Sequence, residues 1–268
     1  MTGGFETALA KLRRAEEHLE GVRKEILAWH DATPYSVQAT VSPDGTRHSM
    51  VVHFAVDLPA VRISILTGDC IHALRSALDH LVYGVAVHQT GADPPPNERQ
   101  IQFPIADDEA RFTSAAKTRL KGLSPELVKA IEAVQPYNRP HAAVPPLLAL
   151  LRDFDDADKH RLLNVVVSAQ AEAKLLSSIR VPAGETTRVS FNEGPLENGA
   201  ETFVVETQTP QPELKLNVAP TFAVAVRHPQ GPNGAEFSEV WALLSYIRDE
   251  VRRIVDDMAA RTKETVRE

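Results

Sequence analysis

The stretch from Val61 to His88 constrains the fold most, because its pattern is that of one long helix. At about 100° per residue, its side chains divide into an aliphatic arc, an arc of small residues and a polar arc. The aliphatic arc consists of Ile71, Leu74, Leu78, Leu81, Val82 and Val85, and the small arc of Cys70, Ala73, Ala77 and Gly84. Such a helix needs neighbours on at least two sides, so we expect it to be central and largely buried.

The polar arc of this helix, here called the polar stripe, is the strongest candidate for a functional site. It consists of Asp69, His72, Arg75, Ser76, Asp79, His80 and Tyr83. Solvent-facing helix surfaces are usually rich in Lys and Glu, and the stripe contains neither. A buried polar stripe costs free energy unless its groups are hydrogen-bonded. We therefore expect a site or a buried network here, the simplest alternative being that the stripe faces water.

Other helices follow from apolar spacings of three and four residues. Phe5 to Trp29 predicts a first helix, and Val240 to Met258 predicts a last one. Shorter helices are predicted over Asp107–Leu120, over Pro125–Val134 after the N-cap Ser124, and from Pro145 as far as Leu163. Just before the predicted helix that begins at Asp107, Phe103-Pro104-Ile105 has the pattern of an anchored extended segment.

Strand patterns occur in two regions of the chain. Ser36–Val41 and His48–Val56, joined by Ser42-Pro43-Asp44-Gly45, predict a β-hairpin. Six further strands are predicted over Val165–Gln170, Leu175–Val181, Arg188–Phe191, Thr202–Thr207, Glu213–Val218 and Phe222–Arg227. This order predicts one α+β domain: a helical bundle around the central helix, with an antiparallel β-sheet region inserted before the C-terminal helix. The helical core would span 1–30, 61–163 and 237–262, and the β-rich part 36–57 and 164–228.

Composition excludes several classes of function. The net charge of −7 argues against a strongly basic nucleic-acid footprint, although it leaves room for a local basic patch. Cys70 is the one cysteine, so neither an intramolecular disulfide nor a cysteine-based zinc site can form. We see no signal peptide and no apolar run long enough to span a membrane, and therefore expect a cytoplasmic protein. No Walker, Rossmann or nucleophile-elbow motif occurs, so no cofactor is implied.

A second polar cluster follows the predicted helix that begins at Pro145. It consists of Asp155, Asp156, Asp158, Lys159, His160 and Arg161. One interpretation is a solvated helix end, or an Arg161 that pairs with Asp69 or Asp79 and locks the bundle. The functional interpretation is that His160 or Arg161 completes the site formed by the polar stripe, with Asp158 as a supporting residue.

Arg75-Ser76-Ala77-Leu78-Asp79-His80 resembles the RxxxxH signature of HEPN-type ribonucleases. The resemblance implies a helical bundle, an RNA partner and a homodimer that brings two motifs together. It also implies that Arg75 stabilises the phosphorane charge and that His80 acts as general acid or base, without a metal. On an ideal helix these two residues lie about 140° apart, an arrangement that suits a dimer interface better than one protomer.

More broadly, the segment from Gly68 to His80 together with Asp158-Lys159-His160-Arg161 resembles a group of uncharacterised bacterial proteins. That resemblance spans most of the chain and implies no activity. The residues themselves leave two alternatives to a ribonuclease. Asp69, His72, Asp79 and His160 could bind a metal ion such as Zn²⁺, Mn²⁺ or Fe²⁺ in a helical bundle. The stripe could instead be a structural hydrogen-bond network in a non-enzymatic protein that binds a partner through its β-region.

Overall fold

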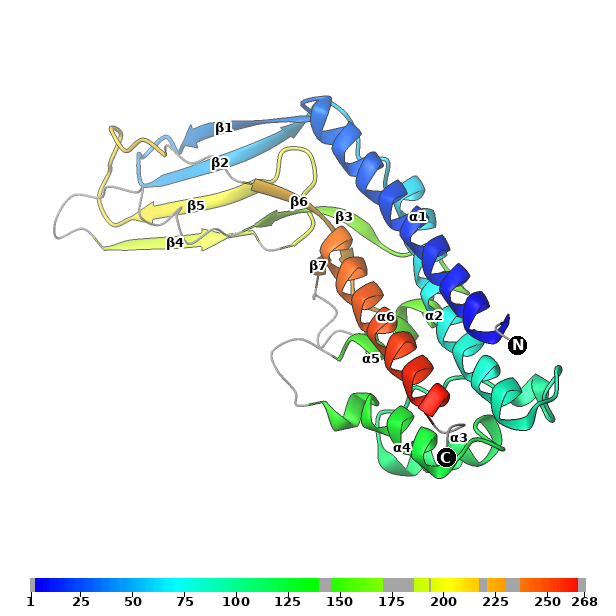
Figure 1. The fold of residues 1–268 in the computed structure, drawn as a ribbon. Helices are drawn as coiled ribbons and strands as arrows, with labels where there is room; N and C mark the ends of the chain where they lie inside the picture. The colour runs from blue at the N-terminus through cyan, green and yellow to red at the C-terminus, as the bar shows by residue number, and fades with distance from the viewer. Residues whose placement is uncertain are drawn as a thin grey trace.

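Figure 1 shows the computed structural model, which describes residues 3–139, 146–170, 186–192, 194–216, 221–229 and 237–264. The helices are α1 (Gly3–Asp31), α2 (Ala60–Thr90), α3 (Glu109–Arg119), α4 (Pro125–Ala133), α5 (Leu147–Asp158) and α6 (Val240–Glu264). Two 3-10 turns are η1 (Glu98–Gln100) and η2 (Pro136–Asn138). The strands are β1 (Tyr35–Val41), β2 (Arg47–Phe54), β3 (Val165–Gln170), β4 (Thr187–Phe191), β5 (Glu201–Thr207), β6 (Thr221–Arg227) and β7 (Phe237–Glu239). The protein therefore belongs to the α+β class.

Helices α1, α2 and α6 lie side by side, and α5 packs against α2 and α6 (Figure 1). The apolar spacing predicted for the C-terminal helix is confirmed, because Val240, Leu244, Ile247 and Val251 are all buried. The aliphatic and small arcs of α2 are buried as well, which confirms that α2 contacts neighbours on more than one side. Helices α3 and α4 lie at the end of this assembly away from the four-stranded sheet (Figure 1).

The strands form two antiparallel sheets rather than one continuous region. One sheet has the order β1-β2-β5-β4, so the N-terminal hairpin pairs with strands from the second half of the chain. The other has the order β3-β6-β7 and lies beside the start of α6 (Figure 1). The four-stranded sheet extends well beyond the ends of the helices (Figure 1).

One face of the four-stranded sheet carries a small apolar cluster of its own, built on Met50, Phe203 and Val205. Leu214 and Leu216 pack against this cluster from the segment after β5. The strand predicted over Glu213–Val218 is therefore wrong for residues 213–216, which cover a sheet face instead of extending a ladder. Residues 217–218, and the strand predicted over Leu175–Val181, lie outside the described residues.

Capping residues set the ends of the shorter helices. The Asp108 carboxylate accepts a hydrogen bond from the Arg111 amide at 2.8 Å and so caps α3, which begins at the next residue, Glu109. Helix α5 ends at Asp158 and not at Leu163, whose carbonyl accepts a hydrogen bond from the Ser64 hydroxyl at 2.8 Å. Within the described part of the chain, no helix is long and apolar enough to cross a membrane.

Candidate functional site

The polar stripe of α2 is only partly buried, which corrects the expectation of a buried stripe. The side chains of Asp69 and His72 are 54% and 70% exposed, whereas that of Arg75 is 10% exposed. Four more stripe residues are half-buried: Ser76, Asp79, His80 and Tyr83. The most exposed stripe residues are thus Asp69 and His72, which lie in the first half of α2.

Arg75 and Asp79 form a buried connection between α2 and the segment that follows η1. The Arg75 Nη2 atom lies 3.1 Å from the Asp79 carboxylate and donates to the Phe103 carbonyl at 2.8 Å. The Phe103 amide in turn donates to the Asp79 carboxylate at 2.9 Å. One ion pair thus binds both backbone polar groups of a residue whose own side chain is fully buried. This confirms the prediction that Phe103-Pro104-Ile105 is an anchored extended segment.

The environment of this pair weakens the charged forms of both residues. Burial lowers the pKa of the Arg75 guanidinium and raises the pKa of the Asp79 carboxyl, although each charge favours the other. The Arg75 Nη1 atom is also buried without a hydrogen-bond partner among the described residues. Desolvation therefore offsets part of the attraction between the two charges, and the pair contributes to the fold mainly by binding the backbone of Phe103.

Gln135 fixes the same segment from the opposite side and was missed by sequence reasoning. Its side chain is completely buried, accepts a hydrogen bond from the Ala106 amide at 2.9 Å and donates to the Pro104 carbonyl at 3.0 Å. The sequence signal was a glutamine between the amphipathic α4 and Pro136, which is too common a pattern to single out. Residues 103–106, here called the anchored segment, are thus bound by α2 on one side and by Gln135 on the other.

The two polar motifs of the sequence meet where α2 packs against α5. His72 Nδ1 lies 3.4 Å from the buried carboxylate of Asp155, which also binds Lys159 Nζ at 2.7 Å. The Asp158 carboxylate lies against the backbone of Gly68, so closely that a Cβ atom at position 68 would overlap it. Burial raises the pKa of Asp158, and the nearby charges of Asp69 and Asp155 add to this effect.

His160 and Arg161 do not complete this contact. Both are exposed, and in the described ranges Arg161 makes no ion pair with Asp69 or Asp79. The contact between the motifs is instead carried by Asp155, which meets His72, and by Asp158, which meets Gly68. The interpretation of the cluster as a partly solvated helix end is therefore closer to the structure than that of a site completed by His160 or Arg161.

His80 and Tyr83 belong to the half-buried part of the polar stripe. Burial lowers the pKa of His80, the charge of Lys11 on α1 lowers it further, and the charge of Asp79 raises it. The Tyr83 hydroxyl donates to the Asp93 carboxylate at 3.1 Å. Arg75, by contrast, reaches the anchored segment. Among the described residues, no hydrogen bond or ion pair links the Arg75 and His80 side chains to a common acceptor outside α2.

The four residues considered as metal ligands are also separated. Asp69 approaches His18 at 3.9 Å, His72 contacts Asp155, and Asp79 binds Arg75. His160 is exposed at the end of α5. Among the described residues, no group of three or more His, Cys, Asp or Glu side chains is arranged to hold a metal ion.

A polar pocket of about 540 Å³ lies beside Asp79 and in front of the anchored segment. It is lined by Asp79, Arg99, Gln100, Ile101, Gln102, Thr118 and Arg119. We call it the Arg99–Arg119 pocket. A neighbouring pocket of about 440 Å³ shares Arg119 and is lined by Ile105, Ala106, Asp107, Arg111, Ala115, Arg152, Asp153 and Asp156 as well. Sequence reasoning singled out Asp79 alone of the residues in the first pocket.

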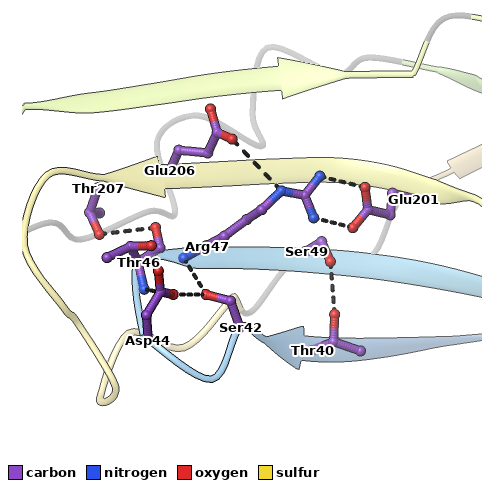
Figure 2. A network of polar contacts seen from close by, with 9 residues as sticks. All are labelled: Thr40, Ser42, Asp44, Thr46, Arg47, Ser49, Glu201, Glu206 and Thr207. Carbon is purple, nitrogen blue, oxygen red and sulfur yellow. Dashed lines mark hydrogen bonds and ion pairs between the residues drawn. The ribbon is translucent and has the colours of Figure 1, made fainter.

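A second polar network lies on the four-stranded sheet, which Figure 1 shows at the opposite end of the molecule from α3 and α4. Figure 2 shows Arg47 of β2 reaching across to two carboxylates of β5: a two-pronged pairing with Glu201 and a contact with Glu206 at 3.7 Å. Thr40 and Ser49 share a hydrogen bond of 2.8 Å between β1 and β2. The hydrogen bond from Arg47 lowers the pKa of Glu201. The polar groups on this face are thus paired with one another.

No protein-family model, curated protein or solved structure matches the chain. The functional conclusion therefore depends on the geometry of the site.

Proposed function

We propose that this chain is a non-enzymatic binding protein whose binding surface is the Arg99–Arg119 pocket, and whose polar stripe has a structural role. The observation that carries the proposal is the position of Arg75. Its guanidinium is occupied by the Phe103 carbonyl and the Asp79 carboxylate, inside the fold. A catalytic arginine must reach a phosphate from the solvent, and only 10% of this side chain is exposed.

The position of His80 supports the same proposal. A general acid or base must lie within hydrogen-bond distance of the reacting atom, together with the group that stabilises its charge. Arg75 donates to the Phe103 carbonyl of the anchored segment, whereas His80 makes no hydrogen bond to that segment among the described residues. A ribonuclease would need a second protomer to bring such groups together, and stays the less supported hypothesis.

The binding part of the proposal comes from the location of the pocket relative to the network. Asp79 lines the pocket and also binds the Phe103 amide and Arg75. Residues 99–102 form one wall and run directly into the anchored segment. The buried network therefore fixes the shape of a solvent-accessible polar pocket, as binding proteins require of the residues behind a ligand site.

The ribonuclease and binding hypotheses are separated by a cleavage assay. We expect fluorescently labelled single-stranded RNA to stay intact with the wild type, with His80→Ala and with His18→Ala. His18 is the matched control because it is a half-buried histidine whose pKa is likewise lowered by burial. Cleavage by the wild type and by His18→Ala, but not by His80→Ala, would overturn the proposal. Cleavage of equal rate in all three preparations identifies a contaminating ribonuclease.

A further inference from the structure

We propose that the Arg99–Arg119 pocket binds a phosphate monoester of nucleotide size. This inference rests on the proposed binding function and names its ligand. Two arginines face a pocket of about 540 Å³, which falls within the size range of small-molecule sites. Guanidinium groups bind phosphate oxygens through paired, charge-assisted hydrogen bonds.

Arg99 and Arg119 differ from Arg111 and Arg152 of the neighbouring pocket, because the latter two form ion pairs within the described part of the chain. In the neighbouring pocket, Arg152 binds Asp107 and Asp153 at 2.8 Å, and Arg111 lies 3.3 Å from Asp108. Neither Arg99 nor Arg119 makes an ion pair or a side-chain hydrogen bond with any residue that the structure describes. Their positive charges are therefore available to a ligand.

Asp79, the carboxylate that lines the pocket, is paired with Arg75 within the fold, and the charge of Arg119 also lowers its pKa. Asp79 binds the Arg75 guanidinium at 3.1 Å and accepts a hydrogen bond from the Phe103 amide at 2.9 Å. Arg75 itself does not line the pocket. The pocket therefore keeps the net positive character of its two arginines, in a chain whose overall net charge is −7.

The other residues that line the pocket favour a ligand that carries further polar groups besides its phosphate. Gln100 and Gln102 can donate and accept hydrogen bonds, Thr118 contributes a hydroxyl, and Ile101 is the apolar member of the lining. Such a surface suits the hydroxyls of a sugar and the edge of a base more than a lipid tail. A small monoester uses all of these groups, whereas inorganic phosphate uses the two arginines alone.

Both arginines are attached to elements that the fold holds in place. Arg99 lies in η1, which leads through Ile101 and Gln102 to Phe103 and its contacts with α2. Arg119 is the last residue of α3, and the following Leu120 is buried and donates its amide to the Ala116 carbonyl at 3.0 Å. Preorganised charges lose less free energy on binding than flexible ones.

Isothermal titration calorimetry of the full chain with adenosine 5′-monophosphate tests the inference. We expect saturable binding, no binding of adenosine, and weaker binding of inorganic phosphate. Arg99→Gln and Arg119→Gln should each weaken binding by about tenfold or more, the usual effect of removing one charge-assisted contact. Lys117→Gln, which removes an exposed charge of α3 outside the pocket, should leave the affinity unchanged.

Absence of binding by both the nucleotide and inorganic phosphate, or equal weakening by Lys117→Gln, would overturn the inference. A single-stranded RNA oligonucleotide that displaces the nucleotide and binds more tightly would assign the pocket to nucleic acid instead of a small monoester. The recovered nucleotide and RNA are checked by chromatography. If the nucleotide and the RNA are recovered intact and do not bind, only the phosphate assignment is contradicted. If either of them is converted to a product, the non-enzymatic function itself is contradicted.

Discussion

Arg75 and Asp79, one turn apart on α2, bind the two backbone polar groups of Phe103. Asp79 accepts a hydrogen bond from the amide at 2.9 Å, and Arg75 donates one to the carbonyl at 2.8 Å. The ion pair itself has a separation of 3.1 Å. Because both backbone groups of Phe103 would otherwise be left unpaired, the pair substitutes for the ladder of a sheet at this point. A helix thereby fixes an extended segment that no strand accompanies within the described residues.

Removal of one member of this pair should destabilise the protein strongly. Arg75→Met leaves the half-buried Asp79 carboxylate without its counter-charge and the Phe103 carbonyl without its donor, and we expect a loss of about 2–4 kcal/mol in the free energy of unfolding. Arg75→Met combined with Asp79→Leu should cost less than the sum of the single changes, because no charge is then left unpaired. Urea denaturation measures all three variants.

The matched control is Arg62→Met, which breaks the exposed ion pair between α2 and Glu25 of α1. Exposed pairs contribute little, so we expect a change of at most about 1 kcal/mol. If Arg75→Met were no more destabilising than Arg62→Met, the structural role assigned to Arg75 would be wrong.

Acidification should destabilise the protein through His18 and His80. Burial lowers the pKa of both below the ordinary value of 6.5. As the pH falls below 6.5, these two histidines therefore bind more protons in the unfolded chain than in the folded chain, and the free energy of unfolding decreases. The raised pKa of Asp79 acts with the opposite sign at lower pH, so variants are compared with the wild type at each pH.

We expect His18→Gln/His80→Gln to lose less stability than the wild type between about pH 7.5 and pH 5.5, as measured by urea denaturation at several pH values. His30→Gln serves as a control on the same helix as His18. An identical pH dependence in the double variant and the wild type would show that these histidines titrate normally in the folded state.

His48 should be replaceable by an apolar residue with a gain in stability. Its side chain is 1% exposed, and neither ring nitrogen has a hydrogen-bond partner in the described structure. Because a buried unpaired polar group is costly, His48→Leu should raise the free energy of unfolding by about 1 kcal/mol. The same change at the exposed His53 of β2 should have little effect. Thermal and urea unfolding that report a loss for His48→Leu would reveal a partner for the imidazole.

Gly68 should tolerate a larger side chain much less well than Gly21. A Cβ atom at Gly68 would overlap the Asp158 carboxylate, whereas at Gly21 it would meet Leu66 at an ordinary 3.4 Å. Gly68→Leu should therefore cost about 1–3 kcal/mol by separating α2 from α5. Gly21→Ala should gain up to about 1 kcal/mol from helix propensity. Equal tolerance at both positions, measured by thermal unfolding, would contradict the packing of Asp158 on α2.

Much of the fold follows from periodicity. The apolar spacing of α2 and α6 predicted both helices and the faces that they bury, because helix packing selects residues three and four positions apart. The strand order did not follow, since β2 pairs with β5 across 150 residues of sequence or more. The position of Leu214 and Leu216 did not follow from periodicity either, because their apolar pattern fits a segment that covers a sheet face as well as it fits a strand.

The candidate site was only partly predictable from the sequence. The composition of the polar stripe drew attention to Arg75 and Asp79, yet their partner is the backbone of Phe103, which carries no side-chain signal. Arg99 and Arg119 come from two elements and show no pattern along the chain. Their importance depends on the absence of an ion pair to either of them in the described fold, which is a property of tertiary structure.

The central claim is that the Arg75–Asp79 pair fixes the anchored segment and thereby the pocket. Amide hydrogen exchange of Phe103, followed by NMR in the wild type and in Asp79→Asn, tests it most directly. We predict strong protection of this amide in the wild type and a loss of protection in Asp79→Asn, with the amides in the middle of α1 unchanged. Rapid exchange of Phe103 in the wild type, or equal protection in both proteins, would contradict the claim.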